Sequence, residues 1–253
     1  MTRLRAALEA SWPPRACHPT GPFVVREGGG GQRVSAATCE GAWTPADLDA
    51  VEARQRALGQ TPLFMIRPGE DRLDAALAAR GYRLKDPVNH YHGPIAPLAA
   101  PPLPPLAAFA LWPPLGAIRA LWAEGGIGPE RIAVMERAAA PKAAILARAR
   151  DRVAGAAFVA IHDAIAVLHA LYVRPELRRQ GSAVNIVRMA ARWAQDHGAK
   201  EISILVTREN APANALYASL GMRVVGHYHY RSKQPGSGKR GAVEGQPPRP
   251  DGT

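Results

Sequence analysis

The stretch LYVRPELRRQGSA, residues 171–183, decides how we interpret the second half of the chain. A strand-like segment runs into a turn at Pro175, continues through Arg178 and Arg179, and reaches small residues at 181–183 before a helical pattern. The first N–H groups of a helix have no acceptor within it, and the helix dipole adds positive potential. Small residues let a ligand approach this backbone, so the stretch indicates a phosphate or pyrophosphate site. A plain strand-to-helix turn with a solvated basic surface is the alternative.

Around this stretch the sequence predicts a succession of helices and strands. The expected helices cover residues 115–126, 129–140, 182–198 and a short segment capped by Asn210, and the expected strands cover 142–151, 152–163, 164–173, 201–207 and 222–231. The long helix has an apolar stripe, and the strand at 201–207 is rich in β-branched residues. This order predicts an α/β (α+β) fold, in which helices pack on a mixed sheet.

The first half shows a weaker version of the same pattern. Strand-like segments lie at 23–27, 33–38, 62–67, 82–84 and 89–95, and helices are expected at 44–59 and 71–81. The glycine run 28–31 favours a hairpin between the first two strands. FMIRPGEDRLDAALAARGYRL (64–84) and SILVTRENAPANALYASLGMRV (203–224) share a strand, a short helix, a glycine and a second strand. We therefore predict an internal repeat of the fold.

Length and composition limit the class of protein. The chain has 253 residues, 47% hydrophobic and 21% charged, which suits one large or two small globular domains. No apolar run reaches the roughly 18–20 residues of a membrane helix. Glu9 and residues 12–14 interrupt any secretory pattern, and Cys17 and Cys39 form neither a disulfide framework nor a CxxC metal pair. We expect a cytoplasmic protein with no membrane association and no metal.

The net charge of +11 favours an anionic partner such as nucleic acid, acidic lipid or a phosphorylated cofactor. No run of Lys and Arg is interleaved with aromatic residues, which disfavours nucleic-acid binding. The same positive charge disfavours polycationic partners through like-charge repulsion.

Two motifs together identify a family. Arg178, Gly181 and Ala183 follow a strand that ends at Leu171-Tyr172-Val173, and a second set comprises Asn210, Ala213, Ala215, Leu216-Tyr217 and Gly221-Met222. Residues 142–231 resemble the GNAT superfamily of acetyl-CoA-dependent N-acetyltransferases. Its signatures are Arg/Gln-x-x-Gly-x-Gly/Ala after a strand, and an Asn before a short helix followed by Ala, Leu-Tyr and Gly-Phe. Only Met222 departs, at a packing position where Phe is usual.

The resemblance implies a GNAT fold and a division of the chain into tandem halves. We expect a degenerate GNAT-like domain at 1–95, a Pro-rich linker at 96–110, a catalytic GNAT domain at 111–231 and a disordered tail at 232–253. The first half has Cys39-Glu40-Gly41-Ala42-Trp43 where the pyrophosphate loop should lie, so cofactor binding there is disfavoured. An unrelated N-terminal domain remains the alternative.

By the same resemblance, the strand 168–173 splays from its neighbour at a β-bulge near Leu171, and acetyl-CoA binds in the opening. A backbone N–H at the bulge would stabilise the oxyanion. The residues expected to bind the cofactor are Leu171, Tyr172, Val173, Arg178, Arg179, Gln180, Gly181, Ser182, Ala183 and Asn210. Asn210 can also serve as the helix N-cap, and the two roles are compatible.

Two catalytic residues are expected. Tyr217 matches the family tyrosine that protonates the departing thiolate; the alternative is a core tyrosine. His169 lies where many members of the family carry a carboxylate, so it could accept the amine proton directly or through water; the alternative is a packed strand histidine. Weaker candidates for the base are His162, Asp163, Glu136, His227 and His229.

The expected activity is transfer of an acetyl group from acetyl-CoA to a primary amine, by direct attack in a ternary complex. The acceptor would be a small molecule or a peptide, and the sequence defines neither it nor the oligomeric state. The alternatives are a non-catalytic, acyl-CoA-binding regulatory protein and a basic nucleic-acid-binding protein.

Overall fold

The computed structural model describes residues 3–233, and the tail expected to be disordered lies outside them from residue 234 onward. Two β-sheets make up the framework. The small sheet is antiparallel and has the order β1 (Ala16–Thr20), β2 (Phe23–Glu27), β3 (Thr38–Cys39). The large sheet has the order β4 (Leu63–Ile66), β11 (Arg223–Ser232), β5 (Arg83–Pro94), β10 (Glu201–Thr207), β9 (Ile165–Val173), β8 (Arg152–His162), β7 (Lys142–Ala149), β6 (Ala108–Leu111).

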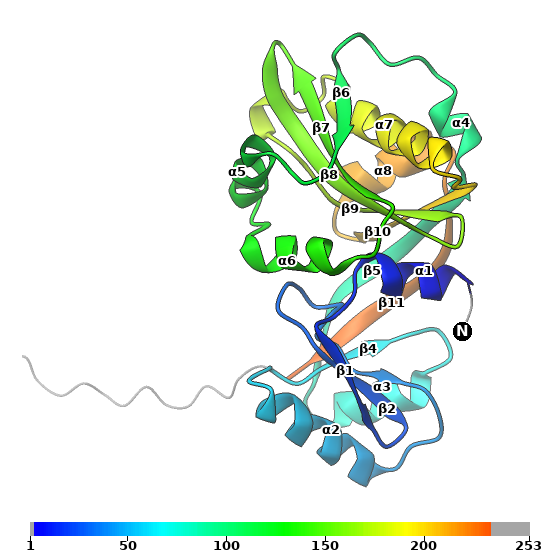
Figure 1. Cartoon of the computed structure of the whole chain (residues 1–253). Helices are drawn as coiled ribbons and strands as arrows, with labels where there is room; N and C mark the ends of the chain where they lie inside the picture. The colour runs from blue at the N-terminus through cyan, green and yellow to red at the C-terminus, as the bar shows by residue number, and fades with distance from the viewer. Residues whose placement is uncertain (1–2, 234–253) are drawn as a thin grey trace, which may run out of the picture.

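The large sheet is mixed, as predicted. The pair β9 and β10 is parallel, and the other neighbouring strands are antiparallel. The helices are α1 (Arg3–Ser11), α2 (Pro45–Ala57), α3 (Asp71–Ala79), α4 (Ala96–Ala99), α5 (Gly116–Glu124), α6 (Pro129–Arg137), α7 (Ser182–Asp196) and α8 (Ala211–Ser219), with a 3-10 turn at Pro175–Leu177. Figure 1 shows two lobes joined by β5 and β11, which run from one lobe into the other.

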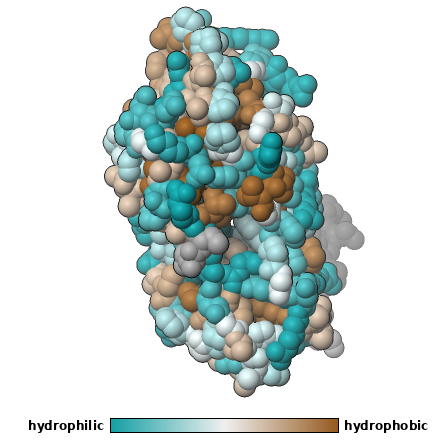
Figure 2. All heavy atoms as spheres, turned by 90° about the vertical axis from the view of Figure 1, so that its right-hand side faces the viewer, coloured by the Kyte–Doolittle hydropathy of each residue, from teal (hydrophilic) through white to brown (hydrophobic). Residues whose placement is uncertain are grey.

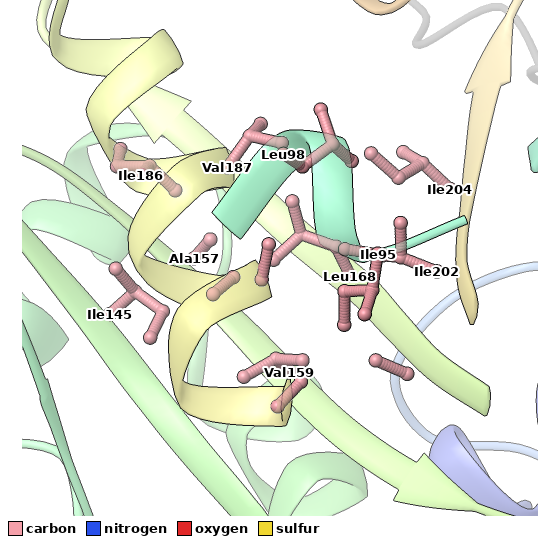
Figure 3. Close-up of a cluster of buried hydrophobic side chains, with 14 of the residues drawn as sticks. Ile95, Leu98, Ile145, Ala157, Val159, Leu168, Ile186, Val187, Ile202 and Ile204 are labelled. Atoms are coloured by element: carbon pink, nitrogen blue, oxygen red, sulfur yellow. The ribbon is translucent and has the colours of Figure 1, made fainter. Parts of the chain in front are cut away.

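The second half of the chain packs helices on both faces of the sheet. On one face, the apolar stripe of α7 packs with α4 against β7 to β10; Figure 3 shows Ile95, Leu98, Ile145, Ala157, Val159, Leu168, Ile186, Val187, Ile202 and Ile204 there. On the other face, α5 and α6 bury Trp122 and Met135 against Phe158 of β8. Burial of such side chains contributes about 1.5–3 kcal/mol each, so this packing on both faces fixes the strand that precedes the Arg178–Ala183 motif.

The predicted internal repeat is present, and its two copies exchange strands. The unit β4-α3-β5 corresponds to the unit β10-α8-β11, and the first strand of each unit pairs with the last strand of the other. Leu63 pairs with Ser232 and Ser203 with His92, so residues 63 and 203, and 92 and 232, differ by the same 140 positions. The sheet therefore has a local two-fold axis at the β5–β11 pair.

Side chains repeat this symmetry. In α3, Asp74 accepts hydrogen bonds from His229 (2.7 Å) and Arg231 (2.7 and 2.8 Å) of β11. In α8, Asn214, which is 140 positions later, accepts from the Asn89 amide (2.9 Å) and the Tyr91 hydroxyl (3.2 Å) of β5. Each helix is thus tied to a strand of the opposite unit.

Two local expectations were wrong, and a third holds only in part. Most of the residues expected to form a strand at 33–38 form a turn in which Ser35 N and Ala36 N bond to Gln32 O, whereas Ala37 forms a parallel bridge to Phe64 and Thr38–Cys39 is a short strand. The glycine run lies in a long connection between β2 and β3, which pair antiparallel as the expected hairpin requires, but only with Val24 opposite Thr38 and Phe23 opposite Cys39. The run lets this connection approach α6, because a Cβ on Gly30 would lie 2.7 Å from the Glu130 carbonyl oxygen.

The expected segments 82–84 and 89–95 form one strand, β5. Pro87 is accommodated because β5 bulges there: Lys85 pairs with Tyr230 and Val88 with Tyr228, and Asp86 adopts a φ of 43°.

The sequence did not reveal α1, β1, α4 or β6, and the last two lie inside the expected linker 96–110. Ser232, at the start of the expected tail, belongs to β11. The division into domains at 1–95 and 111–231 stays a prediction, although the large sheet runs continuously across it.

Exposed hydrophobic side chains are scattered. On the face shown in Figure 2, polar residues surround several separate groups of hydrophobic residues. Between residues 3 and 233, no helix is both long and apolar enough to cross a membrane.

Candidate active site

The strand before the motif loop leaves its neighbour where the resemblance implied. β9 pairs with β10 only from Ile165↔Glu201 to Leu168↔Ile204, and beyond this point the strands separate. On its other side β9 bulges: Tyr172 pairs with Ala156 and His169 with Phe158, so β9 carries one extra residue. Ala170 takes up the extra length with a φ of 52°. The predicted splay and bulge are confirmed.

A cavity of about 1140 Å³ lies in this opening. Its walls come from β9 (168–173), the following loop and first turn of α7 (177–179 and 181–184), β10 (204–207), the α8 region (210, 212, 213, 215–217 and 219), and Trp12, Arg33, Gly125, Ile127, Arg131 and Tyr228. It therefore brings together every residue expected to bind the cofactor except Gln180, whose side-chain amide donates to the Glu176 carbonyl (3.4 Å).

The start of α7 presents hydrogen-bond donors that have no partner within the helix. Gly181 is the N-cap, with a φ of 81° that favours glycine, and the first helical hydrogen bond runs from Asn185 N to Gly181 O (2.9 Å). The N–H groups of residues 182–184 therefore have no acceptor within the helix. The Ser182 hydroxyl is buried and also has no hydrogen-bond partner among the described residues. These unsatisfied donors fit a pyrophosphate group.

Arg178 and Arg179 surround this helix start. The Arg178 Nε donates to the Val173 carbonyl (3.1 Å), which ties the loop to the end of β9. Arg179 adopts a φ of 60°, so the loop turns sharply before Gly181. Both side chains line the cavity and add positive charge beside the free N–H groups.

Tyr217 and Asn210 enter from α8 and its N-terminus. Tyr217 is 4% exposed, and burial raises the pKa of its phenol well above the usual value, so the hydroxyl keeps its proton at neutral pH. Its ring lies 5.6 Å from the ring of Tyr91. Asn210 caps α8 by accepting from Ala213 N (3.1 Å) and also lines the cavity, so its capping role is confirmed.

His169 lies in the cavity wall just before the bulge. Its Nε2 is 2.9 Å from the Ser11 hydroxyl and its Nδ1 is 3.4 Å from Arg33 Nη2. An arginine can only donate, so Nδ1 carries the lone pair and Nε2 the hydrogen. Burial, and then the charge of Arg33, lower the pKa of His169 well below its usual value. The ring is neutral at pH 7, and its role as a base stays a prediction.

The weaker candidates for the base do not line the cavity. Asp163 pairs with Arg3 (2.8 Å), Glu136 with Arg119 (3.1 Å) and His229 with Asp74 (2.7 Å). His162 and His227 are exposed and also lie outside the lining. Sequence reasoning missed Trp12, Arg33, Arg131 and Tyr228, and no motif around them indicates that they meet in the cavity.

The corresponding opening in the first half is closed. Ala37 bridges Phe64 in parallel, as Leu168 pairs with Ile204 in the second half. Beyond the bridge Arg67 donates to the Cys39 carbonyl and pairs with Glu70 (2.6 Å).

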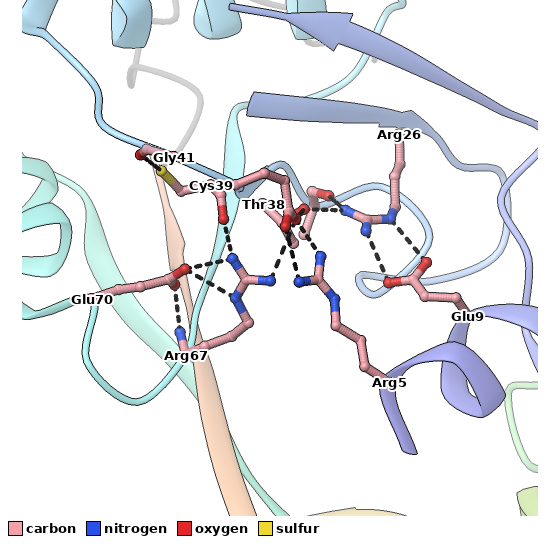
Figure 4. A network of polar contacts seen from close by, with 10 residues as sticks. Arg5, Glu9, Arg26, Thr38, Cys39, Gly41, Arg67 and Glu70 are labelled. Atoms are coloured by element: carbon pink, nitrogen blue, oxygen red, sulfur yellow. Dashed lines mark hydrogen bonds and ion pairs between the residues drawn. The ribbon is translucent and has the colours of Figure 1, made fainter. Parts of the chain in front are cut away.

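Further ion pairs extend this closure (Figure 4). Glu40 pairs with Arg67 (3.4 Å) and with Arg5 of α1. Burial opposes ionisation of Glu40, but hydrogen bonds from Arg5 and Thr38 and the charge of Arg67 outweigh it and lower the pKa to about 2. Side chains that bond to one another thus occupy the place of the cofactor opening.

Sequence comparison agrees with this geometry. Residues 115–222 match the Acetyltransferase (GNAT) family. This part of the chain is a GNAT acetyltransferase domain. The chain is also similar to the "Uncharacterized N-acetyltransferase YobR" of Bacillus subtilis (strain 168), with 30% identity over 76 residues, which is 30% of this chain. The chain spans about 31% of the length of that relative.

Solved structures extend the likeness of fold to the whole chain. A GCN5-related N-acetyltransferase from Kribbella flavida has a TM-score of 0.68 at 17% identity, covering 92% of this chain and 95% of that one. A functionally unknown conserved protein from Staphylococcus epidermidis ATCC 12228 also gives 0.68, at 9% identity, with 87% and 94% covered. A tandem GNAT protein from the clavulanic acid biosynthesis pathway gives 0.59 at 14% identity, with 89% and 86% covered.

Proposed function

We propose that this protein is an acetyl-CoA-dependent N-acetyltransferase whose active site is the cavity between β9 and β10. The observation that carries the proposal is the junction of two features: a bulged, separated strand pair, and a helix start with unsatisfied donors at one end of the same cavity. Acetyl-CoA would supply an activated acetyl thioester and a pyrophosphate. The GNAT assignment of residues 115–222 supports this choice of cofactor.

The chain's own groups can hold both ends of such a molecule. The N–H groups of residues 182–184, the Ser182 hydroxyl, Arg178 and Arg179 would bind the pyrophosphate. The backbone of β9 beyond Leu168 has lost its β10 partner, so its unpaired polar groups are available to the pantetheine amides. An N–H at the bulge would stabilise the oxyanion, as preorganised donors do.

The transfer needs alignment and proton movement and no covalent enzyme intermediate. The amine nitrogen forms the new N–C bond, the C–S bond breaks, and Tyr217 donates a proton to the departing sulfur. The acceptor ammonium loses two protons overall; one ends on the sulfur and the other is released. We assign the first deprotonation to His169, directly or through water, because its neutral ring lies beside the bulge. Alignment of the bound amine with the thioester carbonyl supplies much of the rate enhancement.

The first half would act as a degenerate GNAT-like unit that binds no cofactor. The Arg67–Glu40–Arg5 ion pairs close its opening, and the cavity takes only Trp12 and Arg33 from residues 3–95. Its contribution would be to complete the sheet and one end of the cavity.

Calorimetric titration with acetyl-CoA tests the proposal. We expect one site per chain in the wild type and none in Gly181→Glu, which places a carboxylate at the helix start. A Cβ at Gly181 has open space, so Gly181→Ala measures the backbone strain alone. Gly198→Glu adds the same side chain at the other end of α7, where the φ is also positive (88°), and should bind normally. Absence of binding by the wild type would reject the proposal, and two sites would show that the first half also binds.

A further inference from the structure

The end of the cavity at His169 is built largely by residues outside the GNAT motifs. Trp12 follows α1 and lies against the His169 ring, with centroids 4.9 Å apart and the ring planes tilted by 34°. Arg33 comes from the turn after the glycine run, Arg131 from α6 and Tyr228 from β11. This region is separate from the start of α7, where the pyrophosphate would bind, so an acceptor would enter here.

The positive charge of the cavity lining disfavours binding of an amine that carries no negative charge. Its described lining contains four arginines (Arg33, Arg131, Arg178 and Arg179) and neither Asp nor Glu. Arg178 and Arg179 serve the pyrophosphate in the proposed function, which leaves two guanidinium groups at the acceptor end. An alkylammonium would meet like charges there and no carboxylate among the described lining residues. An acceptor that brings its own negative charge removes this penalty.

Arg33 is the group that such a charge would meet. Its Nη2 is 3.4 Å from His169 Nδ1, a long contact with a neutral acceptor, and its Nη1 is buried with no hydrogen-bond partner among the described residues. Other arginines inside this half are paired: Arg26 donates to Glu9 (2.9 Å) and Arg67 to Glu70 (2.6 Å). A buried donor left without a partner destabilises the protein, and arginine forms two parallel hydrogen bonds to a carboxylate.

We propose that the acceptor is an α-amino acid, or another amine with a carboxylate on the neighbouring carbon, and that Arg33 binds this carboxylate. This inference rests on the proposed function and names its substrate class. An α-amino acid carries its carboxylate and its amine on one carbon. Because Arg33 and His169 are in contact, a carboxylate bound to Arg33 would hold the amine close to His169. A carboxylate on Arg33 would replace the contact to Nδ1, and Nδ1 would then face the amine whose proton must leave.

Matched acceptors test the inference. Acetylation would be followed as release of CoA thiol, with L-amino acids, their amides and the corresponding decarboxylated amines as acceptors. We expect kcat/KM for the amino acids to exceed that of the uncharged analogues by at least about 100-fold. Arg33→Gln should abolish this preference mainly through KM, and Arg33→Lys should restore part of it. Arg83→Gln removes an exposed arginine of β5 that lies outside the cavity lining, and should match the wild type.

Equal use of amino acids and their amides, or an unchanged preference in Arg33→Gln, would overturn the inference. So would a preference for amines carrying a phosphate over those carrying a carboxylate. Thermal shift with amino acids alone gives a second readout: they should raise the melting temperature of the wild type and leave that of Arg33→Gln unchanged. Calorimetry with acetyl-CoA separates the two claims. If the wild type does not bind acetyl-CoA, the proposed function is rejected. If it binds acetyl-CoA but does not acetylate amino acids, only the proposed acceptor class is rejected.

Discussion

The link between α3 and β11 gives a stability prediction whose size follows from the structure. Asp74 accepts hydrogen bonds from Arg231 and His229, and its equivalent in the second repeat is Asn214. Asp74→Asn therefore makes the two repeats alike at this position and keeps the shape of the side chain. What it removes is the negative charge opposite Arg231, whose side chain is 14% exposed.

The magnitude comes from the pKa of Asp74. The hydrogen bond from Arg231 has the largest effect and lowers the pKa. Burial opposes this, the hydrogen bond from His229 lowers the pKa further, and the pKa falls from 3.8 to about 2. Each unit of pKa shift corresponds to about 1.4 kcal/mol, so the ionised carboxylate stabilises the folded state by about 2 kcal/mol at pH 7. The pKa is depressed in the folded state, so this contribution is present above about pH 3.8 and is lost as the pH falls toward 2.

Urea unfolding at several pH values measures the effect. At pH 7, Asp74→Asn should lower the free energy of unfolding by about 2 kcal/mol with an unchanged m-value, and the difference should shrink as the pH approaches 2. Asp71→Asn, an exposed position on the same helix, should change stability by less than about 0.5 kcal/mol. A variant as stable as the wild type at pH 7, or a difference that persists at pH 2, would refute the reasoning.

Three further substitutions test the proton donor, the shape of the cavity at the bulge, and the closed opening in the first half. Tyr217→Phe should lower kcat by about 100-fold or more while calorimetry shows unchanged acetyl-CoA affinity; an unchanged kcat would exclude Tyr217 as the proton donor. Gly155→Ala places a Cβ 2.8 Å from the Tyr172 carbonyl oxygen opposite the bulge. This variant should lower the free energy of unfolding in urea by about 1–3 kcal/mol and weaken acetyl-CoA binding. Wild-type values for both would show that this contact does not shape the bulge. Arg67→Gln removes the ion pair to Glu70 and should lower stability by about 1–3 kcal/mol with acetyl-CoA affinity unchanged, whereas weaker binding would place the cofactor partly in the first half.

The cofactor end of the site was predictable from sequence because its chemistry is local. Gly181 and the residues around it lie within one turn of α7, so the order of small and basic residues is enough to indicate free N–H groups. The strands at 142–173 were also predictable, since their apolar runs are separated by short polar turns and correspond to β7, β8 and β9.

The proposed acceptor end was not predictable because it depends on contacts between distant segments. Arg33 contacts His169, 136 residues later in the chain, and it does so from a turn within the segment 33–38 that was expected to be a strand. The polar strand β5 contains Pro87, and only its bulge against β11 allows it to continue as one strand. Neither feature leaves a local pattern, because tertiary pairing overrides the propensity of both segments.

The exchange of strands also has a consequence for how the chain is made. During synthesis β4 and β5 emerge long before their partners, since β10 begins about a hundred residues after β5 ends and β11 comes later still. Until then both strands expose unpaired edges, which are templates for pairing with another chain. The nascent chain is therefore vulnerable to mispairing and aggregation for most of its translation, and a ribosome-associated chaperone that shields residues 63–94 should raise its yield.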